Sequence, residues 1–443
     1  MIKNEQICWG GMKITNIGGA TAILEHKGRR MLFDPWMNEG ILYGSWYHFP
    51  PLRMSIRDLG HLDYIYISHI HEDHCAPGTI KHLNKNAEII VMHREPRIRN
   101  FVLKFLKNNG FDFKKIHLIA PYTPTEIAPG MTVDMIEAPK DNEYNYLVDS
   151  GLVLKWDGFV IYNANDCPPS SEGLSYIQKV YQKVDLALLP YSGGSGYPGC
   201  YSNLSHEEKL KEKNRIFEMG MKMFTDAVSA FKPVRVMPFA DQYVIGGCKY
   251  ATNQYSPHPP CPGHAQESLR ALGMKDRLLL LNSAQTFDFE TGTKTPDEPY
   301  RLFTEEDRMK YAESLKDRAY DYEILPLNDG IPLERLFVAA RKRLWEAQRK
   351  KNFFTHYHLY FDVMNLEKRF HLPLHEEKIE EVGFKDEPQE PFIRLSGPSS
   401  LFVLMLINHI SWNMADGAFF INYERRPNWY DPSIYAILNY LTV

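Results

Sequence analysis

Histidine and aspartate side chains are concentrated in one short stretch of the chain. Residues 67–78 read "ISHIHEDHCAPG", which places His69, His71, Asp73 and His74 within six consecutive positions. Directly before them, "LDYIYI" is almost continuously apolar, as expected for a strand that is covered on both faces. Neutral imidazole and carboxylate are ligands that borderline divalent metals prefer. The pattern therefore predicts a metal site at a strand end, and a merely polar surface loop is the weaker interpretation.

The spacing of these ligands favours a pair of ions. His69 and His71 lie two apart on extended chain, so both side chains can face the same side. Asp73 and His74 follow as the chain turns, and we expect them to face a second ion. Asp166 ends the expected hairpin "GLVLKWDGFVIYNAND" and is the candidate for a bridging carboxylate. Because paired ions activate water or oxygen and stabilise developing charge, Asp73 and Asp166 are the predicted catalytic residues.

The elements that must position these residues follow a repeated order. Hairpins at 12–36 are followed by an apolar strand, the "EIIVMH" strand and a helix that Gly110 ends. After the Asp157-Gly158 turn, a strand near 184–190 leads to a helix from Ser205, which forms a capping box with Glu208, to about Phe231. This order predicts a layered α/β domain with strand ends near residues 69, 166 and 241 at one edge.

Several other residues are candidates for the same site. Asp241 ends the strand "KPVRVMPFAD" and is a candidate ligand, although such a residue can also form a turn. Asp34 in "FDPW" can orient a ligand histidine from behind. The glycine-rich loop "SGGSGYPG" can bring backbone N–H groups to an anionic substrate, or can simply connect a strand to a helix. The residues expected to bind substrate are Trp36, Gly193, Gly194 and Ser195; His258 and His264 are further candidate ligands.

Composition and charge narrow the class of protein. The chain has 443 residues, with 51 basic and 55 acidic residues and no basic stripe, so we expect no nucleic-acid partner. Its start lacks the apolar core of a secretory signal, and the apolar run "LFVLMLI" is too short for a membrane span. Six cysteines without pairing rhythm indicate a cytoplasmic protein. We expect a catalytic domain at 1–290 and an accessory α+β domain, without a visible chemical motif, at 291–443.

A family resemblance adds to this interpretation. The strand followed by "HIHEDH" resembles the signature of the metallo-β-lactamase superfamily. The stretches "RRMLFDPW", "DYIYISHIHEDH", "VIYNANDC", "GGSGYPG" and "VRVMPFA", with the tail "INYERRPNWYDPSIYAILNYL", are similar to the metallo-β-lactamase-like part of CMP-N-acetylneuraminate hydroxylases. The resemblance implies an αββα sandwich for the first domain, with a smaller α+β domain after it.

Two departures from the family pattern change the expected chemistry. The family's third histidine is missing from "APKDNEYNYLVDSG", where Asp141 and Glu143 are the candidates and Glu143 is the one we assign; Asp241 stands where the last histidine is usual. Harder oxygen ligands move the preference from zinc towards iron or manganese. The hydroxylases also carry a Rieske domain, which needs Cys-x-His. None of the six cysteines precedes a histidine in that way, so an oxygenase would need a separate electron-donor protein.

Three functions remain open from the sequence. The first is a diiron oxygenase that hydroxylates a polar small molecule, for which a sugar or nucleotide-linked substrate is the first class to test. The second is a zinc- or manganese-dependent hydrolase of a phosphoester, lactone or amide. The third is a binding protein with a degenerate site, which the presence of His69, His71, Asp73, His74 and Asp166 disfavours.

Overall fold

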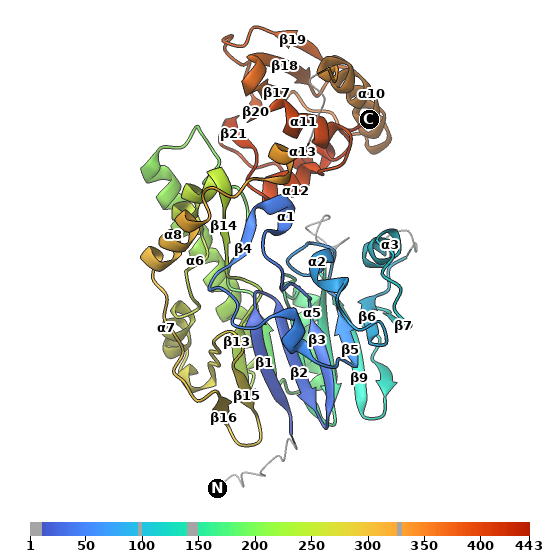
Figure 1. Cartoon of the computed structure of the whole chain (residues 1–443), viewed down its shortest axis with the longest axis vertical. Coiled ribbons are helices and arrows are strands. Elements are labelled where there is room, and N and C mark those ends of the chain that lie inside the picture. The colour runs from blue at the N-terminus through green and yellow to red at the C-terminus, as the bar shows by residue number, and fades with distance from the viewer. Residues whose placement is uncertain (1–10, 96–99, 140–148, 326–329) are drawn as a thin grey trace.

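The first domain is built on two facing β-sheets (Figure 1). The computed structural model describes residues 11–95, 100–139, 149–325 and 330–443. The first sheet has the strand order β16-β15-β1-β2-β3-β5-β6-β7, and its β3, β5, β6 and β7 run parallel. Its strands are β1 (Lys13–Gly18), β2 (Thr21–His26), β3 (Arg29–Phe33), β5 (Tyr64–Tyr66), β6 (Glu88–Met92), β7 (Lys115–Ile119), β15 (Thr286–Asp288) and β16 (Thr293–Thr295).

The second sheet has the order β13-β12-β11-β10-β9-β8. Its strands are β8 (Thr125–Ala128), β9 (Met131–Glu137), β10 (Ser150–Trp156), β11 (Phe159–Asn163), β12 (Leu186–Leu189) and β13 (Arg235–Pro238). The expected hairpin is confirmed: β10 and β11 pair antiparallel around Asp157 and Gly158, whose φ angles of 47° and 88° are those of a tight turn with both central residues at positive φ.

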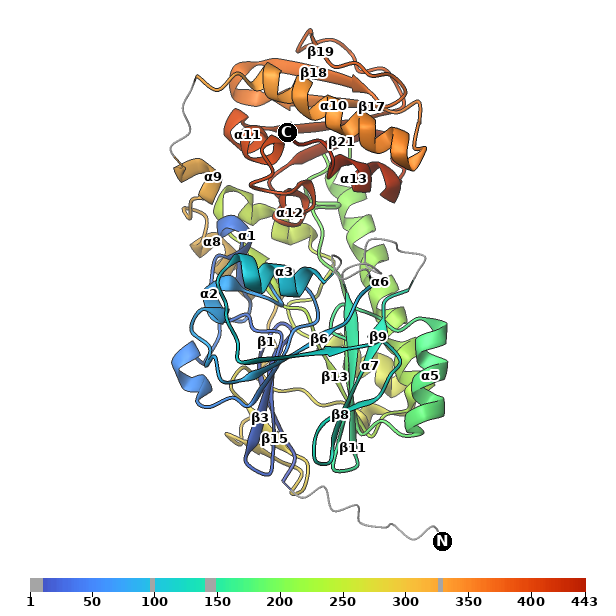
Figure 2. The same ribbon diagram turned by 90° about the vertical axis from the view of Figure 1, so that its right-hand side faces the viewer.

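Helices cover the outer face of each sheet (Figure 2). Apolar side chains of both sheets meet between the sheets. On the first sheet lie α2 (Pro77–Ile80) and α3 (Phe101–Asn108), whose Ile80 and Leu106 pack on strand residues such as Ile65 and Ile89. On the second lie α5 (Ser171–Tyr181), α6 (His206–Phe231) and α7 (His264–Ala271). Since both sheets must bury two faces, their central strands, such as β11 and β12, are buried along their whole length. This arrangement confirms the expected αββα sandwich.

Local sequence signals place the helix ends. Ser205 Oγ accepts from the backbone N–H of Glu208, and Glu208 Oε2 accepts from the N–H of Ser205, which is the predicted capping box of α6. Pro77 begins α2, where its missing N–H removes no helical hydrogen bond.

The topology brings several strand ends to one edge. The parallel strands β11, β12 and β13 end there, and β10 begins there because it pairs antiparallel with β11, with Leu152 opposite Asn163. The loops after Asn163, Leu189 and Pro238, and the residues just before β10, therefore lie together. This is the edge at which the site is built.

A short ribbon and several single-turn elements complete the first domain. The ribbon pairs β4 (Trp46–His48) with β14 (Tyr243–Ile245) and follows α1 (Ile41–Gly44). The 3₁₀ segments are η1 (Ile56–Leu59), η3 (Gly247–Tyr255) and η4 (Lys275–Arg277). Helix α8 (Glu305–Ser314) packs against η3 and β14. The boundary that we expected at 290 therefore falls between β15 and β16, inside the first sheet, and packing with the first domain continues through α8.

The C-terminal residues form a second α+β unit (Figure 1). Its sheet has the order β19-β18-β17-β20-β21, formed by β17 (His358–Val363), β18 (Lys368–Pro373), β19 (Glu380–Val382), β20 (Phe392–Gly397) and β21 (Asn422–Arg426). Its helices are α9 (Asp321–Ile324), α10 (Leu333–Lys351), η5 (Met364–Leu366), α11 (Ser399–Leu406), α12 (Trp412–Gly417) and α13 (Pro432–Leu438). Across the described segments we find no helix with the length and apolarity needed to span a bilayer.

Direct hydrogen bonds join the two units beside the site edge. Ser45 Oγ donates to the carbonyl of Ala418 at 2.7 Å, and Trp46 Nε1 donates to the carbonyl of Gly417 at 2.9 Å. One apolar cluster contains Trp46 of the first domain together with Trp412 of α12. The second unit is therefore docked on the first domain at the place where the strand ends meet.

Candidate metal centre

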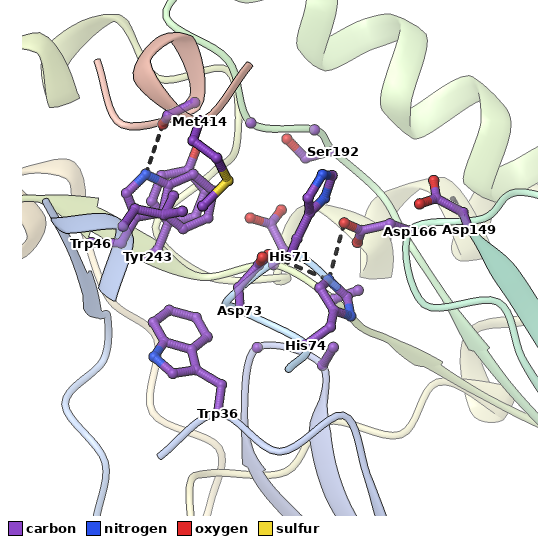
Figure 3. A pocket seen from close by; sticks show the side chains of 18 of the residues that line it. Trp36, Trp46, His71, Asp73, His74, Asp149, Asp166, Ser192, Tyr243 and Met414 are labelled. Carbon is purple, nitrogen blue, oxygen red and sulfur yellow. Dashed lines mark hydrogen bonds and ion pairs between the residues drawn. The ribbon is translucent and has the colours of Figure 1, made fainter. Parts of the chain in front are cut away.

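The loop after β5 and the loop after β11 bring histidine and aspartate side chains together (Figure 3). Ligand atoms of His69, His74 and Asp166 all lie within 4.8 Å of one another. His74 Nε2 is 3.1 Å from Asp166 Oδ2 and 3.3 Å from Asp73 Oδ2, and His69 Nε2 is 2.9 Å from His71 Nδ1. The five residues that the sequence predicted as ligands from these two loops thus converge, although their binding of metal stays a prediction.

Asp34 lies behind this cluster, as expected for a residue that orients a ligand. It is fully buried, and its Oδ2 is 2.9 Å from His74 Nδ1 and accepts from Ser68 Oγ at 2.9 Å. Its Oδ1 accepts from the backbone N–H of Ser68 at 2.7 Å. A carboxylate at Nδ1 holds the proton on that nitrogen and leaves the Nε2 lone pair for an ion. Asp34 therefore fixes the tautomer of His74 that can bind metal.

Two further carboxyl groups face the cluster, Asp241 after β13 and Asp149 before β10. Their side chains are 5% and 6% exposed. Within the described residues, Asp241 Oδ2 and Asp149 Oδ1 form no hydrogen bond, and Asp149 Oδ1 lies 3.7 Å from His69 Nε2. We predicted Asp241 but missed Asp149. The sequence pattern that could have identified Asp149 is its position just before β10, which pairs antiparallel with β11, the strand that precedes Asp166.

The pKa values of His74, Asp149 and Asp241 are all raised, that of His74 by neighbouring charges and those of the two aspartates mainly by burial. Burial lowers the pKa of His74, but the carboxylates of Asp166, Asp73 and Asp34 outweigh it and raise that pKa well above its ordinary value. Burial, and then the charge of Asp166, raises the pKa of Asp149 to about 8. Burial raises the pKa of Asp241 to about 8 as well.

These shifts test whether the site fits a cation. Buried carboxylates that lie near one another repel, so in the absence of a cation some of them must hold protons. Bound metal ions would supply the missing positive charge and the partners that the two orphaned oxygens lack. Three imidazoles and four carboxylates around one space therefore fit a pair of divalent ions.

The space in front of these groups is a cavity of about 290 Å³, called here the metal pocket. Its aromatic wall comes from Trp36 and from Trp46, which stacks on Tyr243 with ring centroids 3.4 Å apart (Figure 3). Its roof comes from α12, where Figure 3 shows Met414 above the cluster. The pocket is lined by Gly19, Ala20, Trp36, Leu42, Trp46, His71, Asp73, His74, Asp149, Asp166, Ser192, Gly193, Gly194, Ala240, Asp241, Tyr243, Asn413, Met414, Asp416 and Gly417.

The other predicted site residues have varied positions. Trp36, Gly193 and Gly194 line the metal pocket, whereas Ser195 lines a neighbouring cavity. Glu143 and Asp141 lie outside the described residues.

Two histidines that we considered as extra ligands pack elsewhere. His258 is buried behind Asp241, with Nδ1 3.8 Å from Asp241 Oδ1 and Nε2 bonded to the carbonyl of Tyr243, and burial lowers its pKa to about 3. His264 is exposed and packs on Phe217.

Comparison with known proteins identifies the domain. Residues 29–239 match the model of the beta-lactamase superfamily domain. A protein of Mycolicibacterium smegmatis that carries a Rieske 2Fe-2S iron-sulfur name is 30% identical over 196 residues, which are 43% of this chain and 36% of that protein. The cytidine monophosphate-N-acetylneuraminic acid hydroxylase of Danio rerio is 24% identical over 243 residues, 53% of this chain and 39% of the hydroxylase.

The chain thus spans less than half of the length of these relatives. Among solved structures, CmlA of Streptomyces venezuelae, described as a diiron β-hydroxylase, aligns with 63% of this chain and 54% of its own at 14% identity and a TM-score of 0.42, a likeness that indicates no function. The family match covers the loops that carry the histidine cluster, Asp149 and Asp166, and it ends just before Asp241. The chain therefore carries a beta-lactamase superfamily domain, and its first domain has the metallo-β-lactamase fold.

Proposed function

We propose that the protein is a dinuclear-metal oxygenase, with two iron ions, that hydroxylates a polar small molecule. The observation that carries this proposal is the composition of the metal pocket, in which Asp73, Asp149, Asp166 and Asp241 accompany the histidines. Carboxylate-rich ligand sets favour iron or manganese over zinc. A sugar or nucleotide-linked molecule is the first substrate class to test, since one group of relatives is named for hydroxylating such a compound.

The residues of this chain would have the following roles. His69, His71, His74, Asp73, Asp149, Asp166 and Asp241 would hold the ions, which when bound activate oxygen or water and stabilise developing charge. Asp34 keeps the proton of His74 on Nδ1, the nitrogen that faces away from the pocket. Trp36, Trp46 and Tyr243 form an apolar wall that limits water beside the reacting carbon. Electrons would come from a separate donor protein.

The first experiment is metal analysis of protein purified without added metal, with an absorption spectrum of the same sample. About two irons per chain with near-ultraviolet charge-transfer bands, and oxygen consumption on adding reductant, would support the oxygenase. About two zincs in a colourless protein that consumes no oxygen would contradict it and favour hydrolysis of a phosphoester, lactone or amide. Protein that neither contains nor takes up metal would contradict both enzymes.

A matched pair of variants tests the ligand assignment. Asp166→Asn removes the charge of the proposed bridge, so the as-purified protein should lose most of its metal. Asp157→Asn is the control, because its side chain is 34% exposed against 35% for Asp166 and lies in the β10–β11 turn, outside the metal pocket. Asparagine also tolerates the positive φ of that turn. Equal metal content in the two variants would remove Asp166 from the ligand set.

A further inference from the structure

A second cavity of about 450 Å³ adjoins the metal pocket, and the two share Asn413 and Asp416 of α12 as lining residues. The second cavity is formed where α6, α12 and the chain from β21 to α13 meet. Its lining comes from both domains and is rich in tyrosine: Ser195, Tyr197, Tyr201, Glu212, Arg215, Asn413, Asp416, Arg425, Asn428, Tyr430 and Tyr435. A molecule that fills both spaces would therefore contact the second domain along much of its length.

The charge of the second cavity centres on Arg425. Its side chain packs among aromatic rings, with the guanidinium 4.9 Å from the ring centroid of Tyr197 and 4.8 Å from that of Tyr201. The residue is only 5% exposed. Its Nε donates to Asn428 Oδ1 at 2.8 Å and its Nη1 to the Tyr435 hydroxyl at 3.4 Å, and both acceptors are neutral.

Arg425 differs in this respect from other arginines of the same sheet. Arg369 forms a buried ion pair with Asp362 at 2.6 Å, and Arg394 pairs with Glu424. Within the described part of the chain, no carboxylate oxygen lies within 4.0 Å of the Arg425 guanidinium. A buried cation is costly unless an anion accompanies it, so this position is one that an anionic ligand would stabilise.

Two acidic groups, Glu212 and Asp416, also line the second cavity. Glu212 is already paired with Arg215 at 2.7 Å. Burial raises the pKa of Asp416 to about 6, against the opposing effects of a hydrogen bond from Tyr423 and the charge of Arg425. The groups that face Asp416 include the hydroxyls of Tyr201, Tyr423, Tyr430 and Tyr435, the Cys200 thiol and the Arg425 guanidinium, whose pKa values all lie well above neutrality.

We propose that the second cavity binds an anionic group, a phosphate or a carboxylate, of the small molecule whose other end enters the metal pocket. The proposal rests on the proposed function for the reacting end, but the anion site itself requires no metal. Arg425 supplies the charge, and the stacked tyrosines hold its planar guanidinium in place, which suits it to oxyanions. The second domain would then select substrates for the metal centre of the first.

The test is a calorimetric titration of the full chain, as purified, with inorganic phosphate and in parallel with acetate. We expect saturable binding of at least one of these anions. The affinity of Arg425→Gln for that anion should be at least about tenfold lower, because a charge-assisted hydrogen bond is lost. Arg426→Gln is the control, because Arg426 is next to Arg425 in the chain but its own side chain is 53% exposed and pairs with Glu424 at 2.9 Å. Preference for phosphate or for acetate identifies the anionic group. Absence of saturable binding of both would overturn the proposal.

A second variant avoids the risk that Arg425→Gln disturbs the fold. Asn428→Asp keeps the shape of an exposed residue and gives the Arg425 guanidinium a carboxylate partner, so anion binding should weaken while thermal stability is kept. Phosphate binding that persists unchanged in Asn428→Asp and Arg425→Gln would overturn the proposal.

Removing the metal distinguishes anion binding in the second cavity from anion binding in the metal pocket. Phosphate should still bind after treatment with a chelator and in Asp166→Asn. Binding that disappears with the metal would place the anion on the ions and overturn the second cavity as its site. Failure of the oxygenase proposal, by contrast, would leave these titrations unchanged.

Discussion

Replacing Asp34 by asparagine should weaken metal binding although the residue touches no ion. Its carboxylate accepts from the Ser68 N–H at 2.7 Å and from Ser68 Oγ at 2.9 Å, and it holds His74 Nδ1 at 2.9 Å. If the asparagine oxygen keeps the Ser68 N–H, its amide N–H faces His74 Nδ1 and drives the ring proton to Nε2. In the reverse orientation, the asparagine amide N–H faces the backbone N–H of Ser68, and these two donors oppose each other.

The magnitude follows from these contacts. A hydrogen bond to a charged group contributes about 1.5–3 kcal/mol, which corresponds to roughly tenfold to 150-fold in metal affinity. Loss of such supporting partners typically costs about 10–100-fold.

The assay is a competition titration of metal-free protein with zinc, used as a redox-inert probe, against a chromophoric chelator. Asp134→Asn is the matched control: Asp134 is also fully buried, and its Oδ2 accepts from the hydroxyls of Tyr176 and Tyr181 at 2.7 and 3.0 Å. An asparagine oxygen can accept both bonds. Zinc affinity of Asp34→Asn within twofold of the unchanged protein would refute the reasoning.

Four further outcomes are expected. Because burial raises the pKa values of Asp149 and Asp241 to about 8, and neighbouring carboxylates raise that of His74 well above its ordinary value, metal uptake at pH 7 should release about three protons to a pH indicator. The metal-free protein should also lose stability as pH rises from about 4 to 8, because Asp149 and Asp241 ionise near pH 4 in the unfolded chain but only near pH 8 in the folded one. Metal uptake without proton release would contradict both of these expectations. Gly194→Ala should disturb the stacked aromatic pair and its near-ultraviolet circular dichroism, because a Cβ there meets both rings, whereas Gly193→Ala has open space and should not. Ser45→Ala should lower the free energy of unfolding by about 1–3 kcal/mol, measured with denaturant, because it leaves the buried carbonyl of Ala418, the residue after α12, without its donor.

Local signals in the sequence were sufficient for much of the fold and for one half of the site. The apolar run before His69 predicted β5, the Ser205–Glu208 pair predicted the beginning of α6, and Asp157-Gly158 predicted the β10–β11 turn. These succeed because they depend on residues a few positions apart, whose periodicity and hydrogen-bonding chemistry are visible in the chain itself.

Only the tertiary structure decided what completes the site. Asp149 directly precedes β10, so a search for ligands at the ends of strands does not find it. The antiparallel pairing of β10 with β11 brings it to the same pocket as Asp166. The α12 residues and Arg425 follow the histidines by more than 330 positions and reach the site because the second domain docks on Trp46. The sequence by itself determined which side chains can bind a metal, through their chemistry and their spacing within one loop. The long-range pairing and docking that determine which residues share a cavity depend on apolar burial across the whole fold, and no local pattern records them.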